Sequence, residues 1–178
     1  DDIEACIVTS DKDMMQLVCD RVYIYDSMKN IIVREQEVKE KLGVMPSLVV
    51  DYLALCGDTS DNIPGVPGIG EKTARELIET LGSVDDIYIN IASIKKPSVR
   101  EKLISGRELA EMSRKLATIR RDVPIDASIE TLTARNEDLQ ELRRIYRELE
   151  FTSLYKEIRG ENNRKKDWPV KKIDEMQT

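Results

Sequence analysis

The stretch GDTSDNIPGVPGIGEKTA, residues 57–74, decides how the fold of this 178-residue chain is interpreted. It begins with two aspartates, Asp58 and Asp61, continues through three closely spaced glycines and ends in a lysine and a threonine. Carboxylates in a loop are typical of a divalent-metal site. Glycines followed by a basic residue are typical of a phosphate site. The first question is therefore whether the phosphate belongs to a nucleotide or to another ligand.

A nucleotide-binding loop does not fit the spacing. The interval from Gly65 to Gly70 matches a Walker A loop, but Glu71 stands between the last glycine and the Lys72–Thr73 pair. The lysine would then point away from the phosphates, and an acid would take its place. No apolar strand precedes the loop, and the GxGxxG fingerprint of dinucleotide sites is absent.

A hairpin between two helices fits better. We expect one helix to end near Cys56, a tight turn fixed by Pro67, and a second helix from Glu71. Glycines permit positive φ and a close backbone approach, and the free N–H groups at a helix start attract an anion. Such a site grips one backbone phosphate without reading sequence. The expected DNA-binding residues are Gly65, Gly68, Gly70, Lys72 and Thr73. A plain helix–turn–helix packing element remains the alternative.

Four aspartates form two short loop clusters. Asp11 and Asp13 follow a predicted strand, and Asp58 and Asp61 lie at a helix–loop junction. Together they could hold two divalent ions that activate water for phosphodiester hydrolysis. Ordinary turn and capping chemistry is the alternative for each pair. Neither cluster has the spacing of an EF-hand loop.

Composition narrows the chemistry further. The chain has no histidine, which excludes histidine-based zinc sites and Ser-His or Cys-His nucleophiles. A metal would be held by oxygen, which favours magnesium, manganese or calcium. Three scattered cysteines suit a reducing cytosol, so we expect a cytoplasmic protein. No apolar run is long enough to span a membrane.

The net charge of −6 conceals an uneven distribution. Residues 95–121 hold nine Lys or Arg against three Glu, and residues 164–172 hold five positive charges against one negative. One basic face could therefore lie on a phosphate backbone. Solvated helix faces are the alternative.

Strands are expected early in the chain and helices later, which predicts an α/β part followed by a helical part. The expected strands are residues 5–10, 21–26 and 30–35. The expected helices are residues 35–43, 46–57, 71–82, 83–91 capped by Ser83, two helices within 98–123 meeting near Gly106, and 136–151 with Asn136 as cap. We predict an α/β core over 1–56, a helical subdomain over 57–160 and a linker over 161–178.

Three blocks of the sequence resemble a known protein family. Residues 8–18, VTSDKDMMQLV, residues 52–88 and residues 116–126, LATIRRDVPID, closely resemble the 5′-nuclease (5′-3′ exonuclease) domain of bacterial DNA polymerase I, part of the flap endonuclease family. The resemblance implies the C-terminal part of a PIN-like sheet followed by a helical subdomain with a helix-hairpin-helix-like element. It also implies a monomer in the bacterial cytoplasm.

The resemblance also implies a metal-dependent 5′ nuclease that removes 5′ flaps or primers from DNA with two Mg²⁺ or Mn²⁺ ions. The implied metal ligands are Asp1, Asp2, Asp11, Asp13, Asp58 and Asp61, with the Val66 and Ile69 carbonyls holding K⁺ at the hairpin. The family's N-terminal half and a helix between Ala5 and Cys6 have no counterpart here. We therefore expect the chain alone to be a weak nuclease, or a non-catalytic module that binds duplex DNA.

Overall fold

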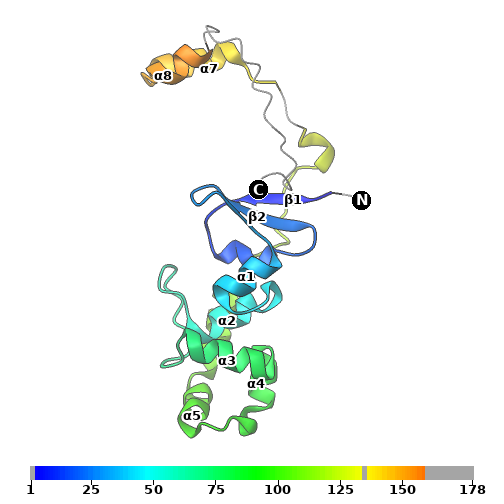
Figure 1. Ribbon diagram of the computed structural model, residues 1–178, viewed down its shortest axis with the longest axis vertical. Coiled ribbons are helices and arrows are strands. Elements are labelled where there is room, and N and C mark those ends of the chain that lie inside the picture. Colours follow the sequence, from blue (N-terminus) through cyan, green and yellow to red (C-terminus); the bar gives the residue numbers. More distant parts are fainter. Residues whose placement is uncertain (1–2, 134–135, 159–178) are drawn as a thin grey trace. The chain divides into compact units, whose positions relative to one another are not determined.

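The computed structural model describes residues 3–133 and 136–158 (Figure 1). Within it the chain divides into two compact units, Asp1–Val123 and Pro124–Thr178, which are described separately. The predicted domain boundaries after residues 56 and 160 stay predictions. Among the described residues, none of the helices is long and apolar enough to cross a membrane.

The first unit begins with a three-stranded sheet (Figure 1). Strand β1 (Ala5–Val8) pairs in parallel with β2 (Val22–Asp26), which pairs antiparallel with β3 (Ile31–Val33). All three predicted strands are present, although β1 ends at Val8, before the predicted Ser10. Strands β2 and β3 form a hairpin.

The connection from β1 to β2 contains a short helical turn that the sequence analysis missed. The 3-10 turn η1 (Asp13–Leu17) follows the loop that carries Asp11. Met15 in this turn and Val18 after it are buried in the core and hold the connection against the sheet. The side chain of Asp13 is thereby fixed at the first position of η1.

Two helices follow the sheet, and the second of them is buried in the core. Helix α1 (Glu35–Leu42) ends at Gly43, which adopts the left-handed conformation expected of a glycine stop. The predicted helix from Pro46 begins with a 3-10 turn, η2 (Pro46–Leu48), and continues as α2 (Val49–Cys56). Most side chains of α2 are buried, so α2 forms the core between the sheet and the later helices.

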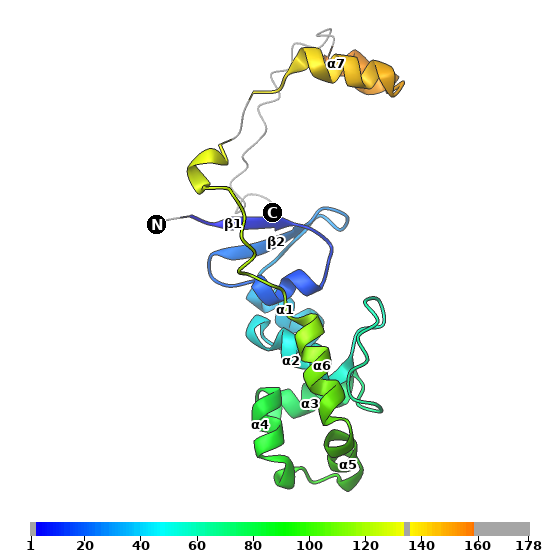
Figure 2. The same ribbon diagram turned by 180° about the vertical axis from the view of Figure 1, so that it is seen from behind.

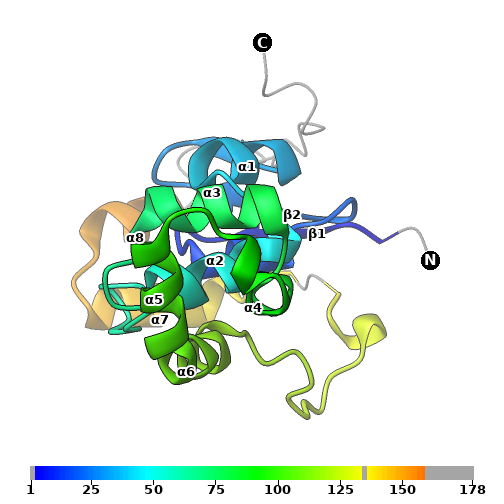
Figure 3. The same cartoon turned by 90° about the horizontal axis from the view of Figure 1, so that it is seen from below.

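The helices after the loop form the far end of the first unit (Figures 2 and 3). They are α3 (Glu71–Leu81), α4 (Val84–Ile89), the 3-10 turn η3 (Ile91–Ser93), α5 (Pro97–Ser105) and α6 (Arg107–Ala117). Helix α6 runs along α2 (Figure 2), although it lies more than 50 residues later in the sequence. The predicted junction of two helices at Gly106 is confirmed.

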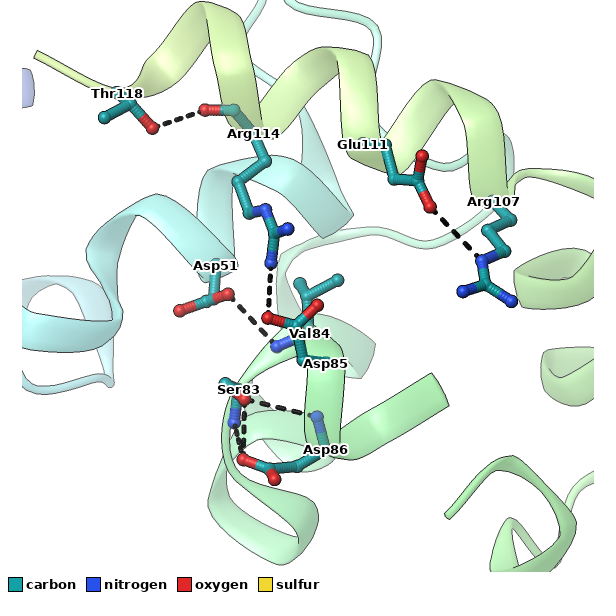
Figure 4. Close-up of polar contacts among 9 residues, drawn as sticks. All are labelled: Asp51, Ser83, Val84, Asp85, Asp86, Arg107, Glu111, Arg114 and Thr118. Atoms are coloured by element: carbon teal, nitrogen blue, oxygen red, sulfur yellow. Dashed lines mark hydrogen bonds and ion pairs between the residues drawn. The ribbon is translucent and has the colours of Figure 1, made fainter. Parts of the chain in front are cut away.

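Polar contacts fix α4 to both α2 and α6 (Figure 4). The N–H of Val84 donates to Asp51 of α2 at 3.1 Å, and Arg114 of α6 donates to Asp85 at 2.8 Å. Ser83 is the helix cap, as predicted, because its hydroxyl accepts the N–H of Asp86. The Asp86 carboxylate in turn accepts the N–H of Ser83 at 3.1 Å, which completes a capping box.

Replacing Ser83 with alanine should destabilise the first unit by about 1 kcal/mol, because the Asp86 N–H loses its acceptor. The expected fall in Tm is about 3 to 5 °C, measured by thermal unfolding followed by circular dichroism. Ser98→Ala is the matched control, because Ser98 lies exposed in the first turn of α5. Equal Tm values for the two variants would contradict the capping role.

The described residues of the second unit form two helices and a 3-10 turn: η4 (Ile129–Thr131), α7 (Leu139–Glu148) and α8 (Thr152–Ile158). Asn136 was the wrong cap for α7, because the Asp138 carboxylate accepts the N–H groups of Gln140 and Glu141. The helix is therefore shorter than residues 136–151. The predicted linker over 161–178 lies outside the described residues.

Candidate functional site

A closed loop at the end of α2 positions two of the predicted aspartates. Asp58 and Ile63 exchange backbone hydrogen bonds, both at 2.8 Å, and Asn62 adopts a left-handed conformation between them. Gly57 before the loop has φ 76°, and a Cβ there would lie 2.5 Å from the Ile63 carbonyl oxygen. The backbone therefore fixes where Asp58 and Asp61 can place their carboxylates.

Three carboxylates from the two predicted clusters meet at this loop. Asp13, Asp58 and Asp61 each offer an oxygen, and the three oxygens lie within 4.8 Å of one another. Asp11 is not in this group, but its carboxylate accepts the Asp13 N–H at 2.9 Å and so lies beside it. Asp1 and Asp2 lie outside the described residues.

The Asp58 carboxylate is the most deeply buried of the three, with 4% of the residue exposed. Its Oδ1 accepts three hydrogen bonds: from the Lys12 Nζ at 2.6 Å, the Ser60 Oγ at 2.7 Å and the Ser60 N–H at 2.9 Å. Burial acts to raise the pKa of Asp58, but these hydrogen bonds outweigh it and hold the pKa below its usual value. Asp58 is therefore ionised.

The pKa of Asp13 is shifted in the opposite direction, upward. Burial, together with the negative charges of Asp11, Asp61 and Asp58, raises the pKa of Asp13 to about 6. Burial is the larger cause, and the three neighbouring carboxylates add to it by repulsion. A bound cation would relieve that repulsion.

Two buried carboxylate oxygens in the cluster indicate that it fits a metal ion. Asp13 Oδ1 and Asp58 Oδ2 are buried and find no hydrogen-bond partner among the described residues. Buried anionic oxygens without a donor are costly, and a divalent cation is the ligand that satisfies several of them at once. The all-oxygen donor set suits magnesium or manganese.

The glycine hairpin between α2 and α3 contains a tight turn. The Ile69 N–H donates to the Val66 carbonyl at 2.9 Å, with Pro67 and Gly68 as the central residues. Gly68 has φ 79°, so this is a type II turn, which favours proline and then glycine at these positions. The predicted turn at Pro67 is confirmed.

The three glycines of the hairpin have different roles. Gly65 has φ 64°, and a Cβ there would lie 2.4 Å from the backbone nitrogen of Gly57, so the two ends of the loop touch at these glycines. Gly70 does not use the positive φ that glycine permits, because it is extended at φ −93°. A Cβ at Gly70 would meet nothing within 4 Å among the described residues.

Helix α6 and the end of α5 hold the hairpin in place. The Gly65 N–H donates to the fully buried Ser113 Oγ of α6 at 3.0 Å. A Cβ at Gly106 would lie 2.8 Å from the Val66 side chain, so only glycine allows this approach. Sequence analysis missed Ser113 because a serine within a helix carries no signal of a partner 48 residues away.

The start of α3 keeps the features expected of an anion site. Gly70 is the N-cap and has no side chain to accept the first N–H groups, and no described side chain caps this helix. Lys72 in the first turn is exposed, and Thr73 is half-buried. By contrast, α4 and α7 are capped by Ser83 and Asp138.

The carbonyls predicted for K⁺ lie in the same hairpin. The Val66 carbonyl accepts the Ile69 N–H within the turn, and the Gly68 carbonyl accepts the Lys102 ammonium at 3.1 Å. The Val66 and Ile69 side chains are buried, which fixes the turn. K⁺ binding at this turn stays a prediction.

A carboxylate cluster beside a glycine hairpin, both at the end of α2, is typical of proteins that process nucleic-acid phosphates. The family model described as "5′-3′ exonuclease, C-terminal SAM fold" matches residues 44–140, more than half of the chain. The chain therefore belongs to the 5′-3′ exonuclease family.

Curated relatives agree with this assignment. The chain is 39% identical over 155 residues to DNA polymerase I of Rhizobium leguminosarum, covering 87% of the chain and 15% of that protein. It is 41% identical over 171 residues to the thermostable DNA polymerase I of Thermus filiformis, covering 94% of the chain and 20% of that protein. The chain thus spans a fifth or less of these relatives.

Solved structures share the fold. A T5 5′-exonuclease with bound divalent metal ions (zinc) is 25% identical, with a TM-score of 0.60 over 64% of this chain and 42% of that one. The catalytic core of Rad2 in complex with DNA substrate is 20% identical, with a TM-score of 0.52 over 80% of this chain and 51% of that one. The likeness to Rad2 concerns the fold alone. The predicted α/β fold with a helical subdomain is confirmed.

Proposed function

We propose that this chain is part of a divalent-metal-dependent 5′ nuclease that removes 5′ flaps or primers from DNA. The observation that carries the proposal is the group of Asp13, Asp58 and Asp61, whose oxygens lie within 4.8 Å of one another and include buried oxygens without a donor. A divalent ion held by these three carboxylates would supply an activated water and stabilise the leaving oxygen. This reaction needs no histidine, and the chain has none.

The proposed ion is Mg²⁺ or Mn²⁺. The described cluster offers ligands for one ion directly, with Asp11 beside it. A second ion requires further carboxylates, for which Asp1 and Asp2 are the candidates in this chain. We place the protein in the bacterial cytoplasm, because its relatives are DNA polymerase I of bacteria. We also propose that it is a monomer, as the resemblance implies.

The proposed DNA grip is the start of α3. Duplex DNA would place one backbone phosphate against the free N–H groups that follow Gly70, and Lys72 and Thr73 would add a charge and a hydroxyl. The binding carries no sequence preference, because it contacts phosphate and no base edge. Flap, nick and primer substrates share this duplex, so all would be bound.

The experiment is a gel assay with a labelled 5′-flap duplex, in Mn²⁺ or Mg²⁺ against EDTA, with a binding lane for each condition. We expect metal-dependent release of short 5′ products, weak for this chain alone and absent in Asp58→Asn. Cleavage that persists in EDTA would contradict the metal mechanism.

The second candidate function is a non-catalytic module that binds duplex DNA. It is favoured by the chain covering only 42% of the T5 5′-exonuclease chain, so that many residues of that nuclease have no counterpart here. Flap binding without cleavage in every metal condition would establish it and overturn the nuclease proposal for this chain.

Gly70→Val tests the phosphate grip. The extended backbone accepts a β-branched residue and the Cβ site is open, so the fold should survive. The valine would keep a phosphate away from the α3 N–H groups and weaken duplex binding about tenfold or more, without changing Mn²⁺ affinity. Fluorescence anisotropy with a labelled duplex measures the effect.

The matched control for Gly70→Val is Thr80→Val, at the exposed opposite end of the same helix. This control should bind duplex DNA as the unchanged chain does. If Gly70→Val also binds with unchanged affinity, the start of α3 is not the phosphate site.

A further inference from the structure

Lys12 lies inside the carboxylate site, between Asp11 and Asp13 in sequence. Its ammonium donates to Asp58 Oδ1 at 2.6 Å and to Ser60 Oγ at 3.0 Å. The Asp58 side chain is only 1% exposed, whereas the Lys12 side chain is 39% exposed. One end of this ion pair is therefore fixed in the protein, and the other end has access to solvent.

We propose that Lys12 is an internal counter-ion of the cluster, which neutralises the carboxylates before a divalent ion binds and competes with that ion. This inference rests on the proposed metal site and adds a residue to it. Like charges at Asp11, Asp13, Asp58 and Asp61 repel one another without a cation, and the ammonium offsets part of that repulsion. The loop over residues 58–63 can then fold without metal.

The two oxygens of Asp58 have different roles: one pairs with Lys12, and the other is left for the divalent ion. Lys12 and Ser60 occupy Oδ1, while the buried Oδ2 has no donor among the described residues. A divalent ion on Oδ2 would be separated from the ammonium by a single carboxylate group. Two cations so close repel, so Lys12 lowers the affinity of the site for the ion.

Removing the ammonium should not disorder the Asp58 carboxylate. The Ser60 N–H and Oγ still donate to Oδ1, at 2.9 and 2.7 Å, and hold the side chain in its present orientation. The change in charge then outweighs any loss of positioning. Lys12→Met keeps an unbranched side chain of nearly the same length and removes its charge and donors, so metal affinity should rise.

The test uses the full 178-residue chain and isothermal titration calorimetry with Mn²⁺. Lys12→Met should bind Mn²⁺ on the order of tenfold more tightly than the unchanged chain, because a half-exposed positive charge is removed next to the ion. Lys12→Arg keeps the charge and should bind Mn²⁺ nearly as the unchanged chain does.

Lys29→Met is the matched control, because Lys29 also pairs with a buried aspartate, Asp26, at 3.9 Å, but on the β2–β3 hairpin. Its Mn²⁺ affinity should be unchanged. Thermal unfolding supplies a second readout: Lys12→Met should unfold at a lower temperature than the unchanged chain in EDTA, and saturating Mn²⁺ should close that gap.

Each result decides between the two proposals. If the unchanged chain binds Mn²⁺ and Lys12→Met binds it equally or more weakly, the counter-ion role is overturned and the metal site stands. If none of the variants binds Mn²⁺, both proposals are overturned. If Lys12 were purely structural, Lys12→Met would lower both the stability and the Mn²⁺ affinity. If Lys12 is a competing counter-ion, Lys12→Met lowers the stability without metal and raises the Mn²⁺ affinity.

Discussion

Asp58→Asn is expected to lower Mn²⁺ affinity by roughly 100-fold or more and to abolish metal-dependent cleavage, while duplex DNA binding stays nearly intact. The amide keeps the shape of the side chain but removes the negative charge from the most buried member of the cluster. Its Oδ2 is one of two buried oxygens that lack a donor, so it is the atom best placed to receive an ion.

Calorimetry with Mn²⁺ and a flap-cleavage gel measure the two losses, and anisotropy measures DNA binding. Asp26→Asn is the control, because Asp26 is equally buried and accepts the N–H of Met28 at 3.1 Å, away from the cluster. Equal loss of metal binding and DNA binding in Asp58→Asn would exclude a specific ligand role and indicate misfolding.

Gly65→Ala is expected to destabilise the first unit by about 2 to 5 kcal/mol, the largest stability effect in this set. The residue has φ 64°, which disfavours any side chain, and the added Cβ would lie 2.4 Å from the Gly57 nitrogen and 2.6 Å from the Cys56 carbonyl carbon. Because these are backbone atoms, the hairpin and the end of α2 must move apart.

The expected fall in Tm is about 10 °C or more, by circular dichroism. Gly70→Ala is the control, because the same added methyl meets nothing within 4 Å at an extended φ. The Gly65 variant should also lose the hydrogen bond from Gly65 N–H to Ser113, and with it the anchoring of the hairpin on α6. A Tm within 2 °C of the control would contradict this view of the hairpin.

Local signals in the sequence predicted most of the elements. Gly43 ends α1 and Ser83 begins α4, and each of them acts only on backbone groups a few residues away. The same holds for the Pro67–Gly68 turn. The α7 cap was misplaced because Asn136 and Asp138 are both good caps, and only the start of the apolar face at Leu139 selects the second.

Contacts between distant residues could not be predicted from the sequence. Lys12 is flanked by aspartates and resembles a solvated charge, yet its partner Asp58 lies 46 residues away. Ser113 meets Gly65 only because α6 packs along α2. The aspartates themselves were found from their loop positions, but the exclusion of Asp11 from the group of three depends on side-chain directions that the sequence does not encode locally.

The most direct measurement is an anomalous difference map from a crystal of the chain soaked in Mn²⁺. We predict a peak between the carboxylates of Asp13, Asp58 and Asp61, in contact with Asp58 Oδ2, and no such peak in Asp58→Asn. A map without a peak at these residues, or with Mn²⁺ only on other carboxylates, would contradict the central claim that this cluster is the metal centre of a nuclease.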